Sequence, residues 1–178
     1  KNKNRIALIG LLVFSPVSLA AEFDMSGING CMIAAHKIKE KTNFLKIEQL
    51  IYKKTIIYEI EVQDPQGKIW ELACRSDGGG NIFQVTQELA SSSDPQFTEG
   101  GVISEEDARA KALAKFPGNV SETEYEKRVP GYSLYEFNIV NEFGLDTRVK
   151  VNATSGEVEE AVIEEWEIHW KAYGKAVD

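Results

Sequence analysis

The chain contains two histidines, and these are the first residues to consider for metal or acid–base chemistry. His36 falls in a predicted helix, where a solvent-facing or capping position accounts for it. His169 has Glu165 four residues before it, and on a helix this spacing would put an imidazole and a carboxylate on one face, as a cation site requires. One histidine among acidic residues is nonetheless a common pattern without a metal. We therefore predict no metal site and no cofactor.

The two cysteines, Cys31 and Cys74, are predicted to form a structural disulfide. Neither the C-x-x-C spacing of redox and metal sites nor a suitably placed histidine accompanies them. A bond between them closes a loop of 44 residues, counted inclusively. In the chain-entropy model such a loop stabilises the fold by about 3–4 kcal/mol.

Catalytic motifs are absent from the sequence. It contains no G-x-S-x-G and no H-E-x-x-H, and the glycine-rich stretch 77–81 lacks the Lys-Ser/Thr and helix of a phosphate loop. Paired carboxylates such as Glu159-Glu160 and Glu164-Glu165 are frequent because the chain is acidic, and none stands out as an acid–base couple. We predict that the protein is not an enzyme and has no catalytic residues.

The N-terminal segment has the features of a secretory signal. Lys1, Lys3 and Arg5 precede an apolar run that ends in Ser18-Leu19-Ala20, so we expect cleavage after residue 20. The run is shorter than the roughly 20 residues of a membrane span, and an uncleaved anchor is the alternative.

Cleavage leaves 17 basic and 28 acidic side chains, a net charge of −11. Such a charge disfavours nucleic-acid binding.

A weak internal repeat predicts the architecture. Tyr58–Gly67 (YEIEVQDPQG) and Tyr135–Gly144 (YEFNIVNEFG) share a tyrosine, a glutamate and a glycine at matching positions, 77 residues apart. Around each stretch the same order of signals recurs: a helix, a short strand, a hairpin with Gly in its turn, and a further strand. The repeated stretch is therefore interpreted as the first arm of a hairpin.

The second copy has the clearer helix signals. Ser104 followed by Glu105-Glu106-Asp107 is typical of a capped N-terminus, and Pro117-Gly118 predicts the stop. In the first copy Ile33, Ala34 and Ile38 indicate a helix whose end is less defined. The Ser-, Pro- and Gly-rich stretch 90–102 is predicted to be a linker.

The second copy resembles a PepSY domain. Ile103–Val120 (ISEEDARAKALAKFPGNV), then YEFNIV, then Val149–Val158 (VKVNATSGEV) follow the pattern of that family, and Asn152, Ala153 and Gly156 match its closing turn. The resemblance covers Ile103 to about Glu165. The first half, from about Gly30 to Glu88, departs from the pattern and is interpreted as a degenerate copy. The resemblance implies a binding or inhibitory module, often associated with peptidases, without catalytic residues of its own.

These signals predict an α+β fold of two PepSY-like units, each a helix packed on a three- to four-stranded antiparallel sheet. The predicted division is a signal peptide (1–20), a degenerate unit (21–89), a linker (90–102), a second unit (103–166) and a C-terminal helix or tail (167–178). The spacing of Ile163, Trp166, Trp170 and Tyr173 indicates the apolar face of that helix, which either packs on a sheet or is left exposed for a partner.

The predicted function is that of an exported binding module, periplasmic or secreted from a bacterium, that restrains a peptidase by protein–protein contact. An exposed sheet edge would add an extended segment of the partner as a further strand. The candidate partner-binding residues are Tyr58, Tyr135, Trp166, Trp170 and Tyr173. The alternatives are a cation- or small-ligand-binding protein of the cell envelope and a structural subunit of an envelope assembly. Membrane association is expected only if the signal segment is retained.

Overall fold

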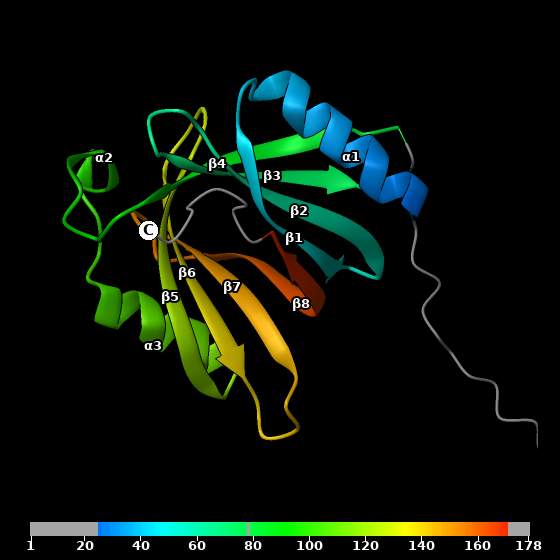
Figure 1. The fold of residues 1–178 in the computed structure, drawn as a ribbon. Helices are drawn as coiled ribbons and strands as arrows, with labels where there is room; N and C mark the ends of the chain where they lie inside the picture. The colour runs from blue at the N-terminus through cyan, green and yellow to red at the C-terminus, as the bar shows by residue number, and fades with distance from the viewer. Residues whose placement is uncertain (1–24, 78, 171–178) are drawn as a thin grey trace, which may run out of the picture.

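The computed structural model describes residues 25–77 and 79–170 (Figure 1). In chain order the elements are α1 (Met25–Ile38), β1 (Asn43–Tyr52), β2 (Thr55–Gln63), β3 (Ile69–Arg75), β4 (Ile82–Leu89), α2 (Pro95–Thr98), α3 (Glu105–Lys115), β5 (Asn119–Arg128), β6 (Ser133–Val140), β7 (Asp146–Asn152) and β8 (Val158–His169). The predicted signal peptide and Tyr173 lie outside the described residues. Among the described helices, none combines the length and apolar character needed to cross a membrane.

The eight strands form one antiparallel sheet that closes into a barrel. Each strand pairs with the next in the chain, and β8 returns to pair with β1 from Lys46–His169 to Ile51–Ile163. The α+β class and the antiparallel strands of the prediction are confirmed. A division into two separate helix-on-sheet units is not confirmed, because the β4–β5 and β8–β1 pairings join the two halves into a single sheet.

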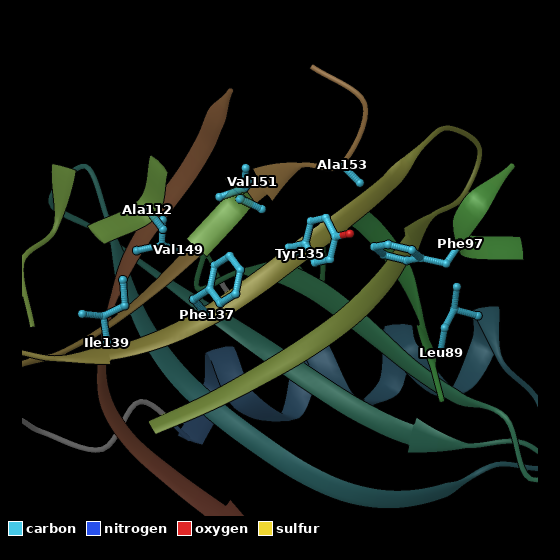
Figure 2. Packing of buried hydrophobic residues seen from close by; sticks show 10 residues of the cluster. Leu89, Phe97, Ala112, Tyr135, Phe137, Ile139, Val149, Val151 and Ala153 are labelled. Atoms are coloured by element: carbon cyan, nitrogen blue, oxygen red, sulfur yellow. The ribbon is translucent and has the colours of Figure 1, made fainter. Parts of the chain in front are cut away.

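The two longer helices cover the outside of the barrel on opposite sides (Figure 1). α1 contacts β2, β3 and β4, whereas α3 contacts β6 and β7. The small side chains of Ala108 and Ala112 let α3 lie close to the sheet, over the apolar cluster of Figure 2. Alternation along the strands sends the residues of the two larger apolar clusters outward beneath the helices, whereas the intervening residues, which include the apolar Leu50, Ile57 and Val162, point into the barrel.

The start of α3 follows the predicted cap. The Ser104 hydroxyl accepts a hydrogen bond from the Asp107 backbone N–H at 3.1 Å, and the first turn carries three acidic residues that face the positive end of the helix dipole. The helix ends at Lys115, just before Phe116 and Pro117, as the sequence predicts.

The predicted linker contains a short packed helix. Asp94 caps α2 by accepting a hydrogen bond from the Gln96 backbone N–H at 2.8 Å. Phe97 of this helix is fully buried and packs edge-to-face on Tyr135, with ring centroids 4.9 Å apart. The segment between the halves is therefore anchored to the barrel rather than acting as a flexible spacer.

The helix predicted at the C-terminus is wrong for the described residues, because Val158–His169 is strand β8. The register of β8 against β1 shifts between Gln49 and Leu50, so that Gln49 lies opposite Trp166 and Ile51 opposite Ile163. Gln49 and Ile51 share a face of β1, and their partners therefore share a face of β8. Because of this irregularity, Ile163 and Trp166 lie on one face of a strand although they are three residues apart, a spacing that is otherwise typical of a helix.

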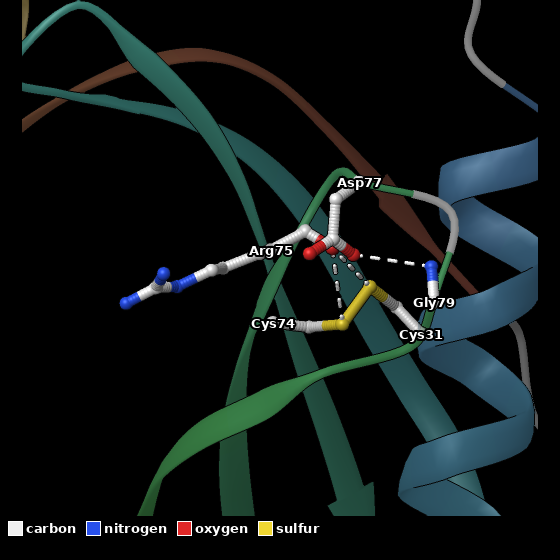
Figure 3. Close-up of a disulfide and its surroundings, with 5 residues drawn as sticks. All are labelled: Cys31, Cys74, Arg75, Asp77 and Gly79. Carbon is white, nitrogen blue, oxygen red and sulfur yellow. Dashed lines mark hydrogen bonds between the residues drawn. A yellow bond between two sulfur atoms is a disulfide. The ribbon is translucent and has the colours of Figure 1, made fainter.

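Cys31 of α1 and Cys74 of β3 form the predicted disulfide, with Cα atoms 5.8 Å apart (Figure 3). Both sulfur atoms are buried beside the carbonyl oxygen of Arg75, at 3.4 and 3.6 Å. In the turn that follows, the Asp77 carboxylate accepts a hydrogen bond from the Gly79 N–H at 3.1 Å. The bond ties α1 to the sheet that it covers.

The approach of the β3–β4 turn to α1 generates the first prediction. Gly80 has φ +63°, and a Cβ at this position would overlap the backbone of Gly30 in α1. Gly67 has φ +80° but open space around it. We expect Gly67→Ala to cost about 1 kcal/mol from the left-handed backbone alone, and Gly80→Ala about 2 kcal/mol more because helix and turn must separate. Urea denaturation of both variants measures the difference, and equal losses would contradict the close packing.

Candidate functional site

The interior of the barrel holds a cluster of charged side chains. Arg148 and Lys150 alternate along β7 with Val149 and Val151, whose side chains face the α3 cluster outside. The inward residues meet glutamates from other strands. This internal charge cluster consists of Glu48, Glu59, Glu71, Glu126, Glu136, Arg148 and Lys150, each at most 3% exposed.

Arg148 binds three carboxylates from three strands. Its guanidinium nitrogens lie 2.8 Å from Glu48 of β1, 2.7 Å from Glu59 of β2 and 2.8 Å from Glu136 of β6. The planar fork of arginine suits such multiple contacts. Arg148 therefore connects its own strand and its neighbour β6 to the opposite wall of the barrel.

Lys150 sits among a second group of carboxylates. Its Nζ lies 2.8 Å from both Glu126 of β5 and Glu136 of β6, and 3.4 Å from Glu71 of β3. The carboxylate oxygens of these three glutamates come within 4.8 Å of one another, as they would around a metal ion. The lysine ammonium supplies a cation at this position, so the group is accounted for without a metal.

The cluster carries more carboxyl groups than cations, five against two. Burial raises the pKa of Glu136, but the charges of Arg148 and Lys150 outweigh it and hold that pKa at about 2. Burial, followed by the charge of Glu71, raises the pKa of Glu126 well above its ordinary value. Burial thus favours the protonated form of Glu126, because uncompensated charges are costly in a buried site.

Glu124 continues the cluster toward the solvent. It lies directly opposite Glu136 in the β5–β6 pair, and burial, together with the charges of Glu136 and Glu71, raises its pKa to about 9. Burial also raises the pKa of Glu88 on β4 to about 7. The interior of the barrel thus holds protons that an unfolded chain would release.

The cluster was not predicted from the sequence. In the sequence, the alternation of Glu59 and Glu61 with Tyr58, Ile60 and Val62 is typical of a strand with one face in water. The signal that could have revealed the cluster is the pair Arg148 and Lys150, which alternates with valines in a strand of the second half and can neutralise such glutamates. In the structure these groups are enclosed, so the cluster joins strands and offers no open surface to a substrate.

Two of the predicted partner-binding residues are inaccessible. Tyr58 and Tyr135 are 0% and 1% exposed, beneath α1 and α3. The Tyr135 hydroxyl donates a hydrogen bond to the Ile103 carbonyl at 2.8 Å. Their strands, β2 and β6, are paired on both sides, so neither offers an edge for strand addition. The structure contradicts this part of the prediction.

Trp166 of β8 and Trp170, which directly follows β8, lie on the side of the barrel that α1 covers. Trp166 is partly buried against Tyr58, with ring centroids 6.2 Å apart. Trp170 is 38% exposed and lies 6.1 Å from the Phe44 ring. Phe44 in turn lines an open pocket of about 530 Å³ with Met32, Ile33 and His36 of α1. We call Met32, Ile33, Phe44 and Trp170 the α1 patch.

The histidines take no part in a cation site with Glu165. His169 lies on a strand, 3.1 Å from the Glu167 carboxylate, and both side chains are exposed. The Glu165 carboxylate instead accepts a hydrogen bond from the Gln49 amide. The possibility that His169 and Glu165 lie on one face of a helix is therefore wrong. His36 is exposed on α1.

The retained protons generate the second prediction. An unfolded glutamate titrates near 4.5, whereas folded Glu124 and Glu88 titrate at about 9 and about 7, so between pH 4.5 and 9 the folded protein binds more protons. Stability therefore falls as the pH rises through this range, while the low pKa of Glu136 makes it fall again toward pH 2. We expect maximal stability near pH 5 and a loss of at least about 1 kcal/mol by pH 9.

Denaturant unfolding between pH 4 and 9 tests this dependence. Glu124→Gln should flatten the alkaline side, because it removes one of the groups that must ionise. Glu122→Gln, an exposed position on the same strand, serves as the matched control and should leave the profile unchanged. A stability that rises from pH 5 to pH 9 in the unaltered protein would refute the assignment.

Comparison with known proteins is informative for the second half of the chain. Residues 102–162 match the PepSY family, described as the peptidase propeptide and YPEB domain. The matched segment begins just before α3 and ends within β8, and it includes Arg148 and Lys150. The comparison with curated proteins gave no match.

One solved structure is similar over most of the chain. It is the crystal structure of a "putative lipoprotein" from Clostridium difficile 630, with 15% sequence identity and a TM-score of 0.35. The similarity covers 75% of this chain and 90% of that protein. In this chain the segment 102–162 that matches the PepSY family model is set within a closed eight-stranded barrel.

Proposed function

We propose that this protein is a non-catalytic binding module of the bacterial periplasm or the secreted fraction, which restrains a peptidase by protein–protein contact. The observation that carries this proposal is the match of residues 102–162 to the peptidase propeptide and YPEB domain. A module of this kind acts by occupying a surface of its partner, so its requirements are a rigid scaffold and an accessible contact face.

We further propose that the first half of the chain is a divergent copy of the same unit. Both halves run helix, then four strands, with the helix on the outer face. The hairpin glycines Gly67 and Gly144 have φ of +80° and +76°, and Gly80 and Gly156 have +63° and +72°. Equivalent turns with equivalent backbone conformations support duplication of one unit.

The internal charge cluster supports a scaffold role. Its carboxylates are enclosed and bound to Arg148 and Lys150, so they lack the access that general acid–base catalysis requires. A barrel connected internally in this way holds its outer surface in a fixed shape, which favours binding by a preformed face.

The α1 patch is the face that we assign to the partner. Ile33 is 58% exposed and Trp170 38% exposed, and Phe44 and Met32 extend the apolar surface between them. Exposed aromatic and long apolar side chains around a shallow pocket are typical anchors of protein interfaces. This patch also retains Trp170 from the residues predicted to bind a partner.

The third prediction concerns this patch. Immobilised protein should retain an extracytoplasmic peptidase from an extract of the source cells, and added protein should slow cleavage by that enzyme. The double variant Ile33→Asp, Trp170→Ala should weaken inhibition at least tenfold, since each residue is an exposed anchor whose loss costs about 1–2 kcal/mol.

Phe143→Ser provides the matched control. Phe143 is 86% exposed at the β6–β7 turn, outside the α1 patch, so its replacement removes a comparable apolar side chain without touching the proposed face. Unchanged peptidase rates in the presence of the folded, unaltered protein would overturn the proposed function. Equal loss of inhibition by Phe143→Ser and by the double variant would overturn the assigned face.

A further inference from the structure

A second pocket lies where the β1–β2 turn, the end of α3 and the strands β6 to β8 meet. It has a volume of about 470 Å³. Its lining is mainly apolar and consists of Ile51, Lys53, Lys54, Lys115, Phe116, Pro117, Ile139, Asn141, Leu145, Thr147, Ala161, Val162 and Ile163. None of these residues belongs to the internal charge cluster or to the α1 patch.

The charged residues of this pocket are all basic. Lys53, Lys54 and Lys115 are exposed, and no carboxylate is among the lining residues. Three ammonium groups without an acidic neighbour in the lining are unusual for a chain of net charge −8. An apolar pocket with such lysines suits a ligand that is apolar along its length and negatively charged at one end.

The backbone of the β1–β2 turn holds two of these lysines in place at an energetic cost. Tyr52 pairs with Thr55, so Lys53 and Lys54 form a two-residue loop, and their φ angles are +48° and +68°. A loop with two positive φ angles is normally Asn-Gly or a similar pair, because larger side chains are strained there. This backbone places both lysines in the lining of the pocket, and the Lys53 Nζ lies 4.8 Å from the centre of the Tyr52 ring.

The edge of β8 is open beside the pocket. β1 pairs with β8 from His169 back to Ile163, where the chain of β1 turns away into β2. From Val158 to Val162, β8 pairs with β7 only. Ala161 and Val162, at the end of this unpaired edge, line the pocket. The segment 158–162 of β8 thus lacks a second strand partner next to an apolar depression and the three lysines, although Val162 itself is 1% exposed.

We propose that this pocket binds an extended apolar peptide segment that ends in acidic groups. The segment adds to the open edge of β8 as a short strand, places apolar side chains in the pocket, and directs its carboxylates to Lys53, Lys54 and Lys115. Strand addition to an open edge, with pockets for alternate side chains, is an established way to bind a peptide. The inference does not depend on the partner being a peptidase or on the α1 patch.

A medium-chain fatty acid is the other amphiphile that such a pocket could hold. It would use the apolar lining and the lysines but would leave the edge of β8 unpaired. The open edge therefore favours the peptide. The two ligands are also distinguishable, because only the peptide protects the backbone amides of residues 158–162 from hydrogen exchange.

The test uses the full chain and a fluorescein-labelled peptide, Gly-Val-Ile-Val-Leu-Asp-Glu, with a free C-terminal carboxylate. Fluorescence anisotropy should show saturable binding tighter than about 1 mM. The amidated peptide with Asn and Gln in place of Asp and Glu should bind at least about tenfold more weakly, as should the labelled peptide in high salt. Peptide binding should also slow amide exchange in residues 158–162.

The variant Lys53→Asn, Lys54→Gly removes both charges and installs the residues that the turn prefers. We expect it to unfold at the same or a higher temperature than the unaltered protein, and to bind the acidic peptide about tenfold more weakly. Lys41→Gly, at another exposed lysine with φ +60°, is the matched control and should bind the peptide normally.

Three results would overturn the proposal. The first is no saturable peptide binding by the folded protein. The second is equal affinity for the acidic and the neutral peptide, or no effect of Lys53→Asn, Lys54→Gly. The third is binding of decanoate, with residues 158–162 unprotected in the presence of the peptide. None of these results bears on inhibition of a peptidase through the α1 patch.

Discussion

The contacts of Arg148 and Lys150 with five buried glutamates determine how the rest of the molecule is arranged. The two cations stand on one strand, β7, and their partners stand on β1, β2, β3, β5 and β6. These polar contacts share the interior with only a small apolar cluster of Leu50, Ile57 and Val162. The two larger apolar clusters lie on the outer face of the strands, where α1 and α3 cover them.

This arrangement decides which surfaces are free for function. Tyr58 and Tyr135, the most prominent residues of the repeated hairpin, fill the layers beneath the helices and are closed to a partner. Because the sheet closes on itself, strand edges remain open only where neighbouring strands diverge. The α1 patch and the pocket beside Lys53 and Lys54 both remain accessible in this arrangement.

Local signals in the sequence predicted local structure well. The Ser104 cap, the stop after Lys115, the hairpin glycines and the Cys31–Cys74 bond depend on neighbouring residues or on chemistry that the sequence displays directly. Alternation also identified two faces on each strand, but it could not tell whether a polar face meets water or the opposite wall of a barrel. The β8 strand was mistaken for a helix because its register shift near Glu165 brings Ile163 and Trp166 onto one face.

The charge cluster also explains why the halves form one body. Three of the buried glutamates, Glu48, Glu59 and Glu71, come from the first half, whereas both buried cations come from β7 of the second half. Lys46 of β1 lies 3.3 Å from Glu48, but the ion pairs that Glu59 and Glu71 make are with β7, and without it these two carboxylates would be stable only in water. With it, they must share Arg148 and Lys150 with Glu126 and Glu136, and the surplus is carried as protons. Glu59 and Glu71 of the first half therefore take their counter-ions from the second half, and these contacts help to hold the two halves as a single closed barrel.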